Sequence, residues 1–304
     1  MIEARASKSF AAAEGRTPSR PSTRRSASLR ARPSSALPWL NLVCLDAPIV
    51  AVSWQWLFAR SFGIAIPPGA TAALFLTAWL IYIADRFDDS VFMEGRAATS
   101  SRQRFCLQHR VAWLGATAFV ACADVFVIST QLNVRLLVLG AVIGACALVY
   151  LVTNQKLPRV WRLLPLKEVS IGFLFVAGTV AGLVDEMTSA MLASWLLFAG
   201  LCSLNCISIA VWERELDLAQ RRVSLATAFP RSQRYLLPAT LVLSAAAFAI
   251  AMSTHIGARV YLCVGVSGLL LASVHSFRRH IQSDARTALA DLVLMTPLLA
   301  VFVA

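Results

Sequence analysis

The sequence has few charged residues, few histidines and no pair of cysteines with the spacing of a metal or redox motif. Only 14% of its 304 residues are Asp, Glu, Lys or Arg, whereas 58% are hydrophobic, and the mean hydropathy is +0.68. A soluble domain needs more polar surface than this, so the composition excludes one. The seven cysteines mostly lie in apolar runs, which excludes a disulfide framework and a zinc site.

Long apolar runs recur along most of the chain. A helix needs about 20 apolar residues to cross a bilayer. The runs are continuously apolar rather than alternating, which favours helices over a barrel. We therefore predict an all-α integral membrane protein, a bundle of about nine transmembrane helices. The predicted spans are 38–59, 69–84, 111–130, 133–153, 169–184, 190–212, 236–254, 258–277 and 287–304.

The basic residues are distributed unevenly between the connections. All but three of the 28 Lys and Arg residues precede the first span or follow the second, fourth, sixth and eighth spans; the exceptions are Arg60, Arg135 and Arg259. The positive-inside rule then predicts a cytoplasmic N-terminus and an external C-terminus, in the cell (inner) membrane. The net charge of +12 is thus explained by a lipid bilayer as partner, and no nucleic acid is expected.

The first 36 residues differ from the rest of the chain. They are rich in Arg, Ser, Ala and Pro and contain no apolar core, so they are no secretory signal. We predict a disordered basic N-terminal tail that lies near anionic lipid heads. An organelle transit peptide is the alternative, although Glu3 and Glu14 argue against it. Residues 37–304 are predicted to form one transmembrane domain.

A first acidic cluster, Asp85 to Asp89, follows the second apolar run. If the helix continues through it, Asp85, Asp88 and Asp89 share one helical face. Carboxylates are costly near hydrocarbon, and at a helix C-terminus they also oppose the helix dipole. A Mg²⁺ ion with oxygen ligands would offset both effects. The alternative is a solvated helix end in which Arg86 is a local partner.

A second acidic cluster, Glu213 to Asp217, ends the sixth run. Glu213 and Asp217 are four residues apart and face one way on a helix, while Glu215 points elsewhere. Both clusters fall on the same predicted side of the membrane, where they could face each other across a cavity and hold Mg²⁺. The alternative is an ordinary charged loop. The predicted metal ligands are Asp85, Asp88, Asp89, Glu213 and Asp217.

Two lysines flank the connection between the fourth and fifth runs. Lys156 closes one predicted helix and Lys167 opens the next. An ammonium group is a good point-charge partner for phosphate, so we predict that both bind a diphosphate. Simple positive-inside flanking is the alternative for both lysines, and it is the preferred interpretation of Arg159 and Arg162.

These stretches resemble the UbiA superfamily of intramembrane prenyltransferases. The resemblance covers nearly all of residues 37–304. It implies a nine-span helical bundle around a central cavity, with Mg²⁺ held at two aspartate-rich motifs. The matching stretches are Tyr82-Ile83-Ala84-Asp85-Arg86-Phe87-Asp88-Asp89, Tyr150 to Lys156 continuing through Leu164 to Glu168, Trp212-Glu213-Arg214-Glu215-Leu216-Asp217, and Asp291 to Pro297.

The chain departs from the family pattern at three positions. Ala84 stands where the first motif commonly has Asn, Phe92 stands where it has a third Asp, and Glu213 opens the second motif in place of Asp. The number and reach of the carboxylates matter more for holding Mg²⁺ than their identity.

The expected function is Mg²⁺-dependent transfer of a prenyl group from an isoprenoid diphosphate to a hydrophobic acceptor, aromatic or otherwise from a lipid pathway. It would take place at the cytoplasmic membrane face, in quinone or lipid biosynthesis, and Asp85, Asp88, Glu213 and Asp217 would be the catalytic residues. The alternatives are a secondary transporter or lipid carrier, and a catalytically silent member of the family.

Three acids, Asp46, Asp124 and Asp291, lie inside predicted spans, and Asp124 is expected to be structural. Asp46 precedes Pro48, which is expected to bend the first helix there. Intramembrane carboxylates commonly face a cavity, so Asp46 and Tyr150 are candidates for contact with the acceptor. Pairing of Asp46 with a polar side chain of a neighbouring helix is the equal alternative. Asp291, in the last span, has Arg286 as its expected partner.

Overall fold

The computed structural model describes residues 36–92, 100–163 and 166–301, and within these ranges it contains helices and no strand. Residues 1–35 of the predicted tail lie outside the described residues. The helices are α1 Ala36–Leu42, α2 Asp46–Phe62, α3 Pro68–Phe92, α4 Ser101–Gln108, α5 Arg110–Gln131, α6 Val134–Lys156, α7 Pro158–Leu163, α8 Lys167–Val180, η1 Ala181–Glu186, α9 Ser189–Trp212, α10 Arg214–Ala219, α11 Leu225–Ala228, η2 Pro230–Ser232, α12 Gln233–Ser253, α13 Ala258–Ser276, α14 Ser283–Leu292, η3 Val293–Met295 and α15 Thr296–Val301.

Every predicted span corresponds to a helical segment of this structure. Seven helices of the described chain are long and apolar enough to cross a membrane, and they match the second to eighth predicted spans. The prediction of an all-α membrane bundle is therefore confirmed. The first and last predicted spans are also helical over their described residues, but each is interrupted, so neither is one continuous helix.

The first span breaks between α1 and α2. Cys44 adopts a positive φ of 60°, two residues before Asp46 begins α2. Pro48 lies in the first turn of α2, where its missing N–H is tolerated. The bend that the sequence predicts near Pro48 is present, and it is a complete interruption. The indole of Trp79 donates to the Val43 carbonyl at 3.1 Å and so satisfies one backbone group at the break.

The last span breaks at η3, between α14 and α15. The Trp54 indole donates to the Leu294 carbonyl at 2.7 Å, which satisfies a backbone group that the change of helix type exposes. Trp54 itself is fully buried and stacks on Phe198 with ring centroids 3.9 Å apart. This aromatic pair lies within the main hydrophobic core.

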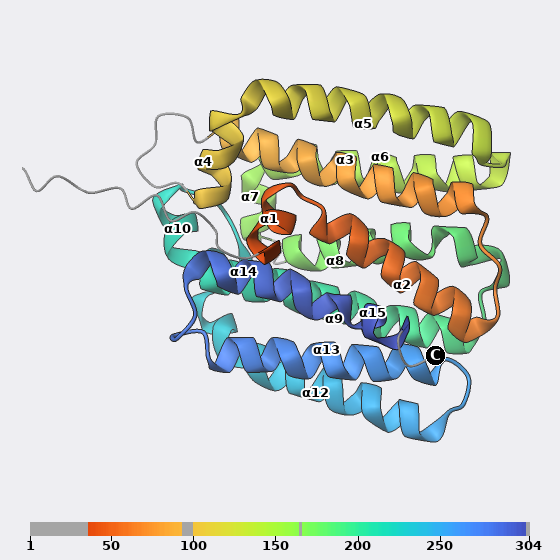
Figure 1. The fold of residues 1–304 in the computed structure, drawn as a ribbon. Helices are drawn as coiled ribbons and strands as arrows, with labels where there is room; N and C mark the ends of the chain where they lie inside the picture. The colour runs from red at the N-terminus through yellow and green to blue at the C-terminus, as the bar shows by residue number, and fades with distance from the viewer. Residues whose placement is uncertain (1–35, 93–99, 164–165, 302–304) are drawn as a thin grey trace, which may run out of the picture. The chain divides into compact units, whose positions relative to one another are not determined.

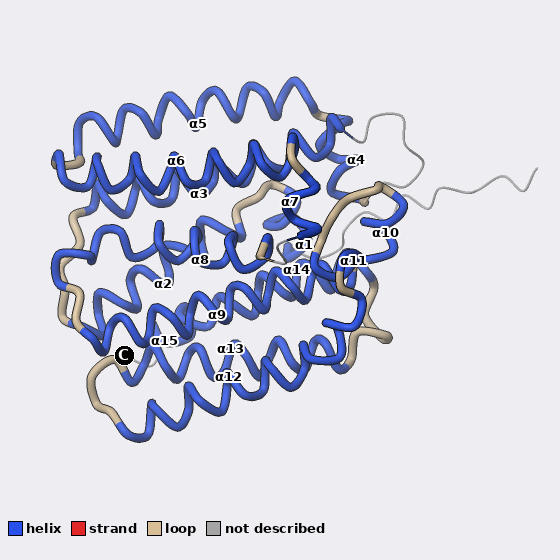
Figure 2. The backbone as a smooth tube through the Cα atoms, turned by 180° about the vertical axis from the view of Figure 1, so that it is seen from behind, coloured by secondary structure: helices blue, strands red, loops and turns tan. Residues whose placement is uncertain are grey.

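The helices run side by side, with α5 and α12 on opposite sides of the bundle and α9 between them (Figures 1 and 2). Helix α9 packs against α8, α12, α13 and α14. Gly172 of α8 lets that helix approach α9 closely, because a Cβ at this position would lie 2.6 Å from the Ser203 backbone nitrogen.

The short helices of the connections gather at one end of the bundle. Helices α4, α7, α10 and α11 all lie at the end that is on the left in Figure 1 and on the right in Figure 2. We call this the charged end, because these helices and the residues joining them carry most of the basic residues between the spans. The common placement agrees with the alternation of connections that the nine predicted spans imply.

Candidate functional site

A small polar cavity of about 40 Å³ lies at the charged end, where α3, α4 and the α9–α10 junction meet. A volume of this size holds roughly three water molecules. Three guanidinium groups and two carboxylates line it, together with polar neighbours. The lining residues are Arg86, Ser100, Arg102, Gln103, Glu213, Leu216, Asp217, Gln220 and Arg222. The cavity thus contains both carboxylates of the second predicted cluster but only Arg86 of the first.

Helix α3 brings Arg86 of the first cluster to this cavity, whereas Asp85 is not among the lining residues. The helix continues through Asp85 to Phe92, as the sequence predicts. Arg86 is half-buried, donates from Nη2 to the Tyr82 hydroxyl at 2.8 Å and lines the cavity. Asp85 is also half-buried and interacts electrostatically with the Arg86 guanidinium. The side chains of Asp88 and Asp89, two of the predicted metal ligands, lie outside the described residues.

Glu213 joins three elements at the cavity. It is the residue that ends α9 and precedes α10. Its Oε1 atom lies 2.5 Å from Nη2 of Arg102 on α4 and accepts a hydrogen bond of 3.1 Å from the Thr287 hydroxyl on α14. Arg102 therefore compensates the charge of Glu213, which the sequence assigned to a metal ion.

Asp217 follows on α10 and faces the same cavity as Glu213, as their spacing predicts, while Glu215 between them is exposed. Burial raises the pKa of the Asp217 carboxyl from its ordinary value of 3.8 to about 6, against the opposing effects of Ser224, Arg222 and Lys167. An acid with a pKa close to neutral exchanges a proton or a cation readily, which is typical of functional sites.

The two predicted diphosphate lysines have different surroundings. Lys167 begins α8, donates to the Val223 carbonyl at 3.3 Å and is close enough to lower the pKa of Asp217. Lys156 ends α6 with an exposed side chain, and it does not belong to the residues that line the cavity. The structure thus brings Lys167 near the acidic pair.

The residues that sequence reasoning missed come mainly from α4. A capping box, in which Ser100 and Gln103 cap each other's backbone, starts this helix and holds Arg102 toward the cavity. The side-chain amide of Gln220, the residue after α10, donates to Gln103 at 3.0 Å, and both residues form part of the cavity wall. The sequence Ser-Ser-Arg-Gln is a readable capping signal, and it could have identified α4 as an ordered helix rather than a loop.

The intramembrane acids form a second polar cluster, deeper in the bundle. Asp46 is buried, and its Oδ2 atom accepts a hydrogen bond of 2.5 Å from Nδ2 of Asn41. The same amide group donates to Asp291 at 3.0 Å, and Asn205 donates to the other Asp291 oxygen at 3.4 Å. Asp46 therefore does pair with polar side chains. The expected Arg286 partner of Asp291 was wrong, because two asparagines hold this carboxyl instead.

Tyr150, the other acceptor candidate, packs against Trp161 of α7, with ring centroids 5.7 Å apart. It lies near the charged end of α6, a helix on which no residue of the apolar stretch is buried. The structure gives Tyr150 an aromatic neighbour and does not place it beside the cavity-lining residues of the described chain.

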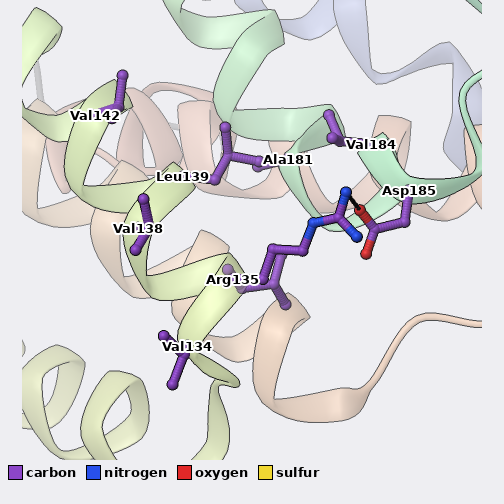
Figure 3. A pocket seen from close by; sticks show the side chains of 9 residues that line it. Val134, Arg135, Val138, Leu139, Val142, Ala181, Val184 and Asp185 are labelled. Carbon is purple, nitrogen blue, oxygen red and sulfur yellow. Dashed lines mark ion pairs between the residues drawn. The ribbon is translucent and has the colours of Figure 1, made fainter.

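A wider pocket of about 550 Å³ lies elsewhere, between the start of α6 and η1 (Figure 3). Valines and two leucines line most of it, and the exposed ion pair of Arg135 and Asp185 spans 2.9 Å at its edge. An apolar groove on a poorly covered helix of a membrane bundle is a surface that lipid chains fill.

Comparison with known proteins locates the fold. No protein-family model and no curated protein sequence matches the chain. Among solved structures, the chain is similar to the apo structure of a UbiA homologue from Aeropyrum pernix K1, with a TM-score of 0.55 and 16% sequence identity. The match covers 85% of this chain and 98% of that chain.

This chain has the UbiA fold. The resemblance to the UbiA superfamily that the sequence predicts is therefore confirmed at the level of the fold. At 16% identity the likeness carries no residue roles with it, so the chemistry of the site rests on the side chains described above. In this chain, residues of α3 and α4 and of the α9–α10 connection line the polar cavity, and α4 and α10 lie at the charged end.

Proposed function

We propose that the protein is a Mg²⁺-dependent prenyltransferase that moves a prenyl group from an isoprenoid diphosphate to a hydrophobic acceptor. One observation carries this proposal: three guanidinium groups and two carboxylates surround one cavity at the charged end of a UbiA-like membrane bundle. Guanidinium groups bind phosphate oxygens, and carboxylates bind the cation that accompanies a diphosphate. Apolar helices beside them suit the prenyl chain.

Arg86, Arg102 and Arg222 are the proposed diphosphate ligands, with Lys167 beside them. Each guanidinium group can donate two parallel hydrogen bonds to a phosphate, which fixes orientation as well as charge. The cavity of about 40 Å³ is smaller than a diphosphate group, so the arginines must move apart when the substrate binds. The exposed Lys156 would serve as an outer contact for the incoming anion.

The described carboxylates fit a magnesium ion that the substrate helps to hold. No group of three or more His, Cys, Asp or Glu side chains with metal-binding geometry occurs in the described chain. Mg²⁺ commonly takes only one or two carboxylates and completes its shell with water and substrate phosphates. Glu213 and Asp217 provide that number at the cavity, and Asp85, Asp88 and Asp89 extend the set on α3. Mg²⁺ would supply additional neutralisation of the diphosphate.

The side chains of the cavity then favour departure of the diphosphate. Negative charge develops on the leaving oxygens as the C–O bond breaks, and guanidinium groups positioned beforehand stabilise that charge. The allylic carbon lies on the side of the apolar helices, where little water can reach it. The acceptor adds there and releases a proton. Asp46 and Tyr150 stay as candidates for contact with the acceptor.

The distribution of basic residues decides to which membrane face we assign the site. The charged end carries most of the connection arginines and lysines, so we place it at the cytoplasmic face of a cell (inner) membrane, with the N-terminus on the same side. The isoprenoid chain would enter sideways from the bilayer, and its diphosphate would stop at this face.

The decisive experiment compares Asp217→Asn and Asp85→Asn with Glu215→Gln, an exposed acid of the same short helix. Purified protein in lipid nanodiscs is incubated with Mg²⁺, radiolabelled prenyl diphosphates of several lengths and a lipid extract of the native membranes, and adducts are detected by mass spectrometry. We expect the aspartate variants to lose about a hundredfold in transfer and Glu215→Gln to keep it. Full transfer by either aspartate variant would overturn the metal assignment. A protein that binds no prenyl diphosphate would instead be a transporter or a silent relative.

A further inference from the structure

Asp46 and Asp291 come together from opposite ends of the described chain. Asp46 is the first residue of α2, and the interruption after α1 turns Asn41 back toward it. Asp291 lies on α14, and one of its carboxyl oxygens is within hydrogen-bond distance of the same Asn41 nitrogen that contacts Asp46. The Asn41 amide bridges the two by donating to Oδ2 of each. The interruptions of the first and last spans thus lie next to these two acids.

The two carboxyl groups lie close together, because one amide nitrogen reaches an oxygen of each. Two ionised carboxylates have no donor and repel each other, whereas one acid and one carboxylate share a proton favourably. One proton shared between Asp46 and Asp291 removes this repulsion, and such a proton belongs to the pair rather than to either residue. The pair has one negative charge with which to accept a second proton.

Charged and polar groups around the pair act on its charge, and two of these groups also line the polar cavity. Arg86 and Tyr82 of α3 and Arg102 of α4 act on it electrostatically, as do Cys44 before α2 and Cys206 of α9. Arg86 and Arg102 also line the polar cavity. Arg86 and Arg102 therefore adjoin both the pair and the proposed diphosphate site.

One buried atom next to the pair has no partner. Asn205 is 4% exposed, and its amide nitrogen donates to Asp291, but its Oδ1 atom accepts no hydrogen bond. A buried carbonyl oxygen without a donor is costly. Asp46, Asn41 and Asn205 are all buried, whereas Asp291 keeps part of its surface accessible. The cluster thus combines a buried oxygen without a donor, on Asn205, with the partly accessible carboxyl of Asp291, and a ligand with a hydrogen-bond donor would satisfy the former.

We propose that the Asp46–Asp291 pair binds the O–H or N–H group of the prenyl acceptor and takes its proton during transfer. This rests on the prenyltransferase function proposed above. The C–O bond of the donor breaks and its electron pair leaves with the diphosphate. A lone pair of the acceptor oxygen or nitrogen forms the new bond to the allylic carbon. The proton of that O–H or N–H group moves to the ionised carboxylate of the pair, and it is later lost to water.

The shared proton of the pair can be tested without an acceptor. Protonated and ionised carboxyls have distinct infrared bands, so wild-type protein at neutral pH should show the C=O stretch of one buried protonated carboxyl, and Asp291→Asn should lack it. Asp124→Asn is the matched control, because Asp124 is another buried intramembrane acid, hydrogen-bonded to Thr77 at 2.9 Å in another part of the bundle. Absence of a band that depends on Asp291 would overturn the shared proton.

Transfer assays test the catalytic role. We expect Asp291→Asn to bind radiolabelled geranylgeranyl diphosphate within about twofold of wild type and to lose at least about a hundredfold in adduct formation with the native lipid extract. Asp291→Glu should restore part of the rate with a shifted pH profile. Normal transfer by Asp291→Asn, with diphosphate binding intact, would refute this inference alone. Failure of the wild type to bind any prenyl diphosphate would refute the proposed function, and the role of the pair in transfer with it.

Discussion

Arg102 of α4 lies 2.5 Å from the Glu213 carboxylate at the end of α9, and this ion pair closes the polar cavity. It joins two connections that are 111 residues apart in the chain. Both side chains are largely covered, with 11% and 20% of their surface exposed, so the pair is better shielded from solvent than an ordinary surface ion pair.

Replacement of Arg102 should weaken the binding of a diphosphate. Arg102→Gln removes one of three guanidinium groups from the cavity and leaves Glu213 without its cationic partner. We expect the affinity for a prenyl diphosphate to fall about tenfold to a hundredfold, as for a charged hydrogen bond worth about 1.5–3 kcal/mol. Equilibrium binding of radiolabelled substrate measures this. Arg104→Gln, an exposed arginine on the same helix, is the control, and an equal loss there would indicate only long-range attraction.

Acidic pH should weaken magnesium-dependent binding through Asp217. Its pKa is raised to about 6, so the carboxyl is ionised at pH 7 and becomes protonated as the pH falls through that value. A cation competes with the proton, so we expect the affinity for Mg²⁺ to fall by up to tenfold per pH unit below about 6. Titrations of Mg²⁺ in the presence of a prenyl diphosphate between pH 5 and pH 8, a range of about one to two units around this pKa, test the expectation. Asp217→Asn should abolish this dependence.

The raised pKa of Asp217 also affects the stability of the metal-free protein. The folded pKa of Asp217 lies above its ordinary value of 3.8, so the folded state binds the proton more tightly than the unfolded state. Ionisation therefore lowers the stability as the pH rises from about 4 to about 6. We expect Asp217→Asn to raise the thermal unfolding midpoint at pH 7 in the absence of Mg²⁺. A lowered midpoint would show that neighbouring cations stabilise the carboxylate more than burial destabilises it.

A methyl group at Gly172 should push α8 away from α9. The added Cβ would lie 2.6 Å from the Ser203 nitrogen, a backbone atom that cannot rotate away. Gly172→Ala is expected to destabilise the protein by about 1–3 kcal/mol, measured as thermal unfolding in a fixed detergent. Gly140→Ala on α6 is the control, because its added Cβ meets nothing within 4 Å. That change should be neutral or slightly stabilising, since alanine is the better helix former.

Loss of the Trp54 indole N–H should destabilise the protein at the helix interruption formed by η3. Trp54→Phe keeps an aromatic ring for stacking on Phe198 but leaves the Leu294 carbonyl without its donor at 2.7 Å. A buried polar group left without a partner costs about 1–3 kcal/mol, and a drop of that size in unfolding free energy is expected. Trp39→Phe, at a residue that is 46% exposed, should change it little. Equal effects of both changes would mean that ring size rather than the hydrogen bond matters.

Local sequence patterns predicted the helices well. Each apolar run became helical because an isolated backbone in lipid must satisfy its own hydrogen bonds, whatever the neighbouring helices do. The bend near Pro48 and the continuation of α3 through Asp85 also followed from local rules. The break at η3 did not, since it depends on the donor that Trp54 supplies from another helix.

The candidate site was predicted in part. The spacing of Glu213 and Asp217 placed both carboxylates at one cavity, as observed. Their partners could not be predicted from spacing. Arg102 belongs to the connection before α5 and α6, which is far from Glu213 in the sequence. A sequence gives the chemical type of a loop arginine, and only the docking of its loop decides which carboxylate it meets.

The sequence by itself determined the membrane class, the helical spans, the common end of the charged connections and the type of charge at the site. These follow from hydropathy and periodicity, which act over one helix at a time. The tertiary structure decided which side chains meet: Arg102 with Glu213, and Asp46 with Asp291. Such contacts join residues more than a hundred positions apart. They depend on how whole helices pack, and no local pattern encodes that packing.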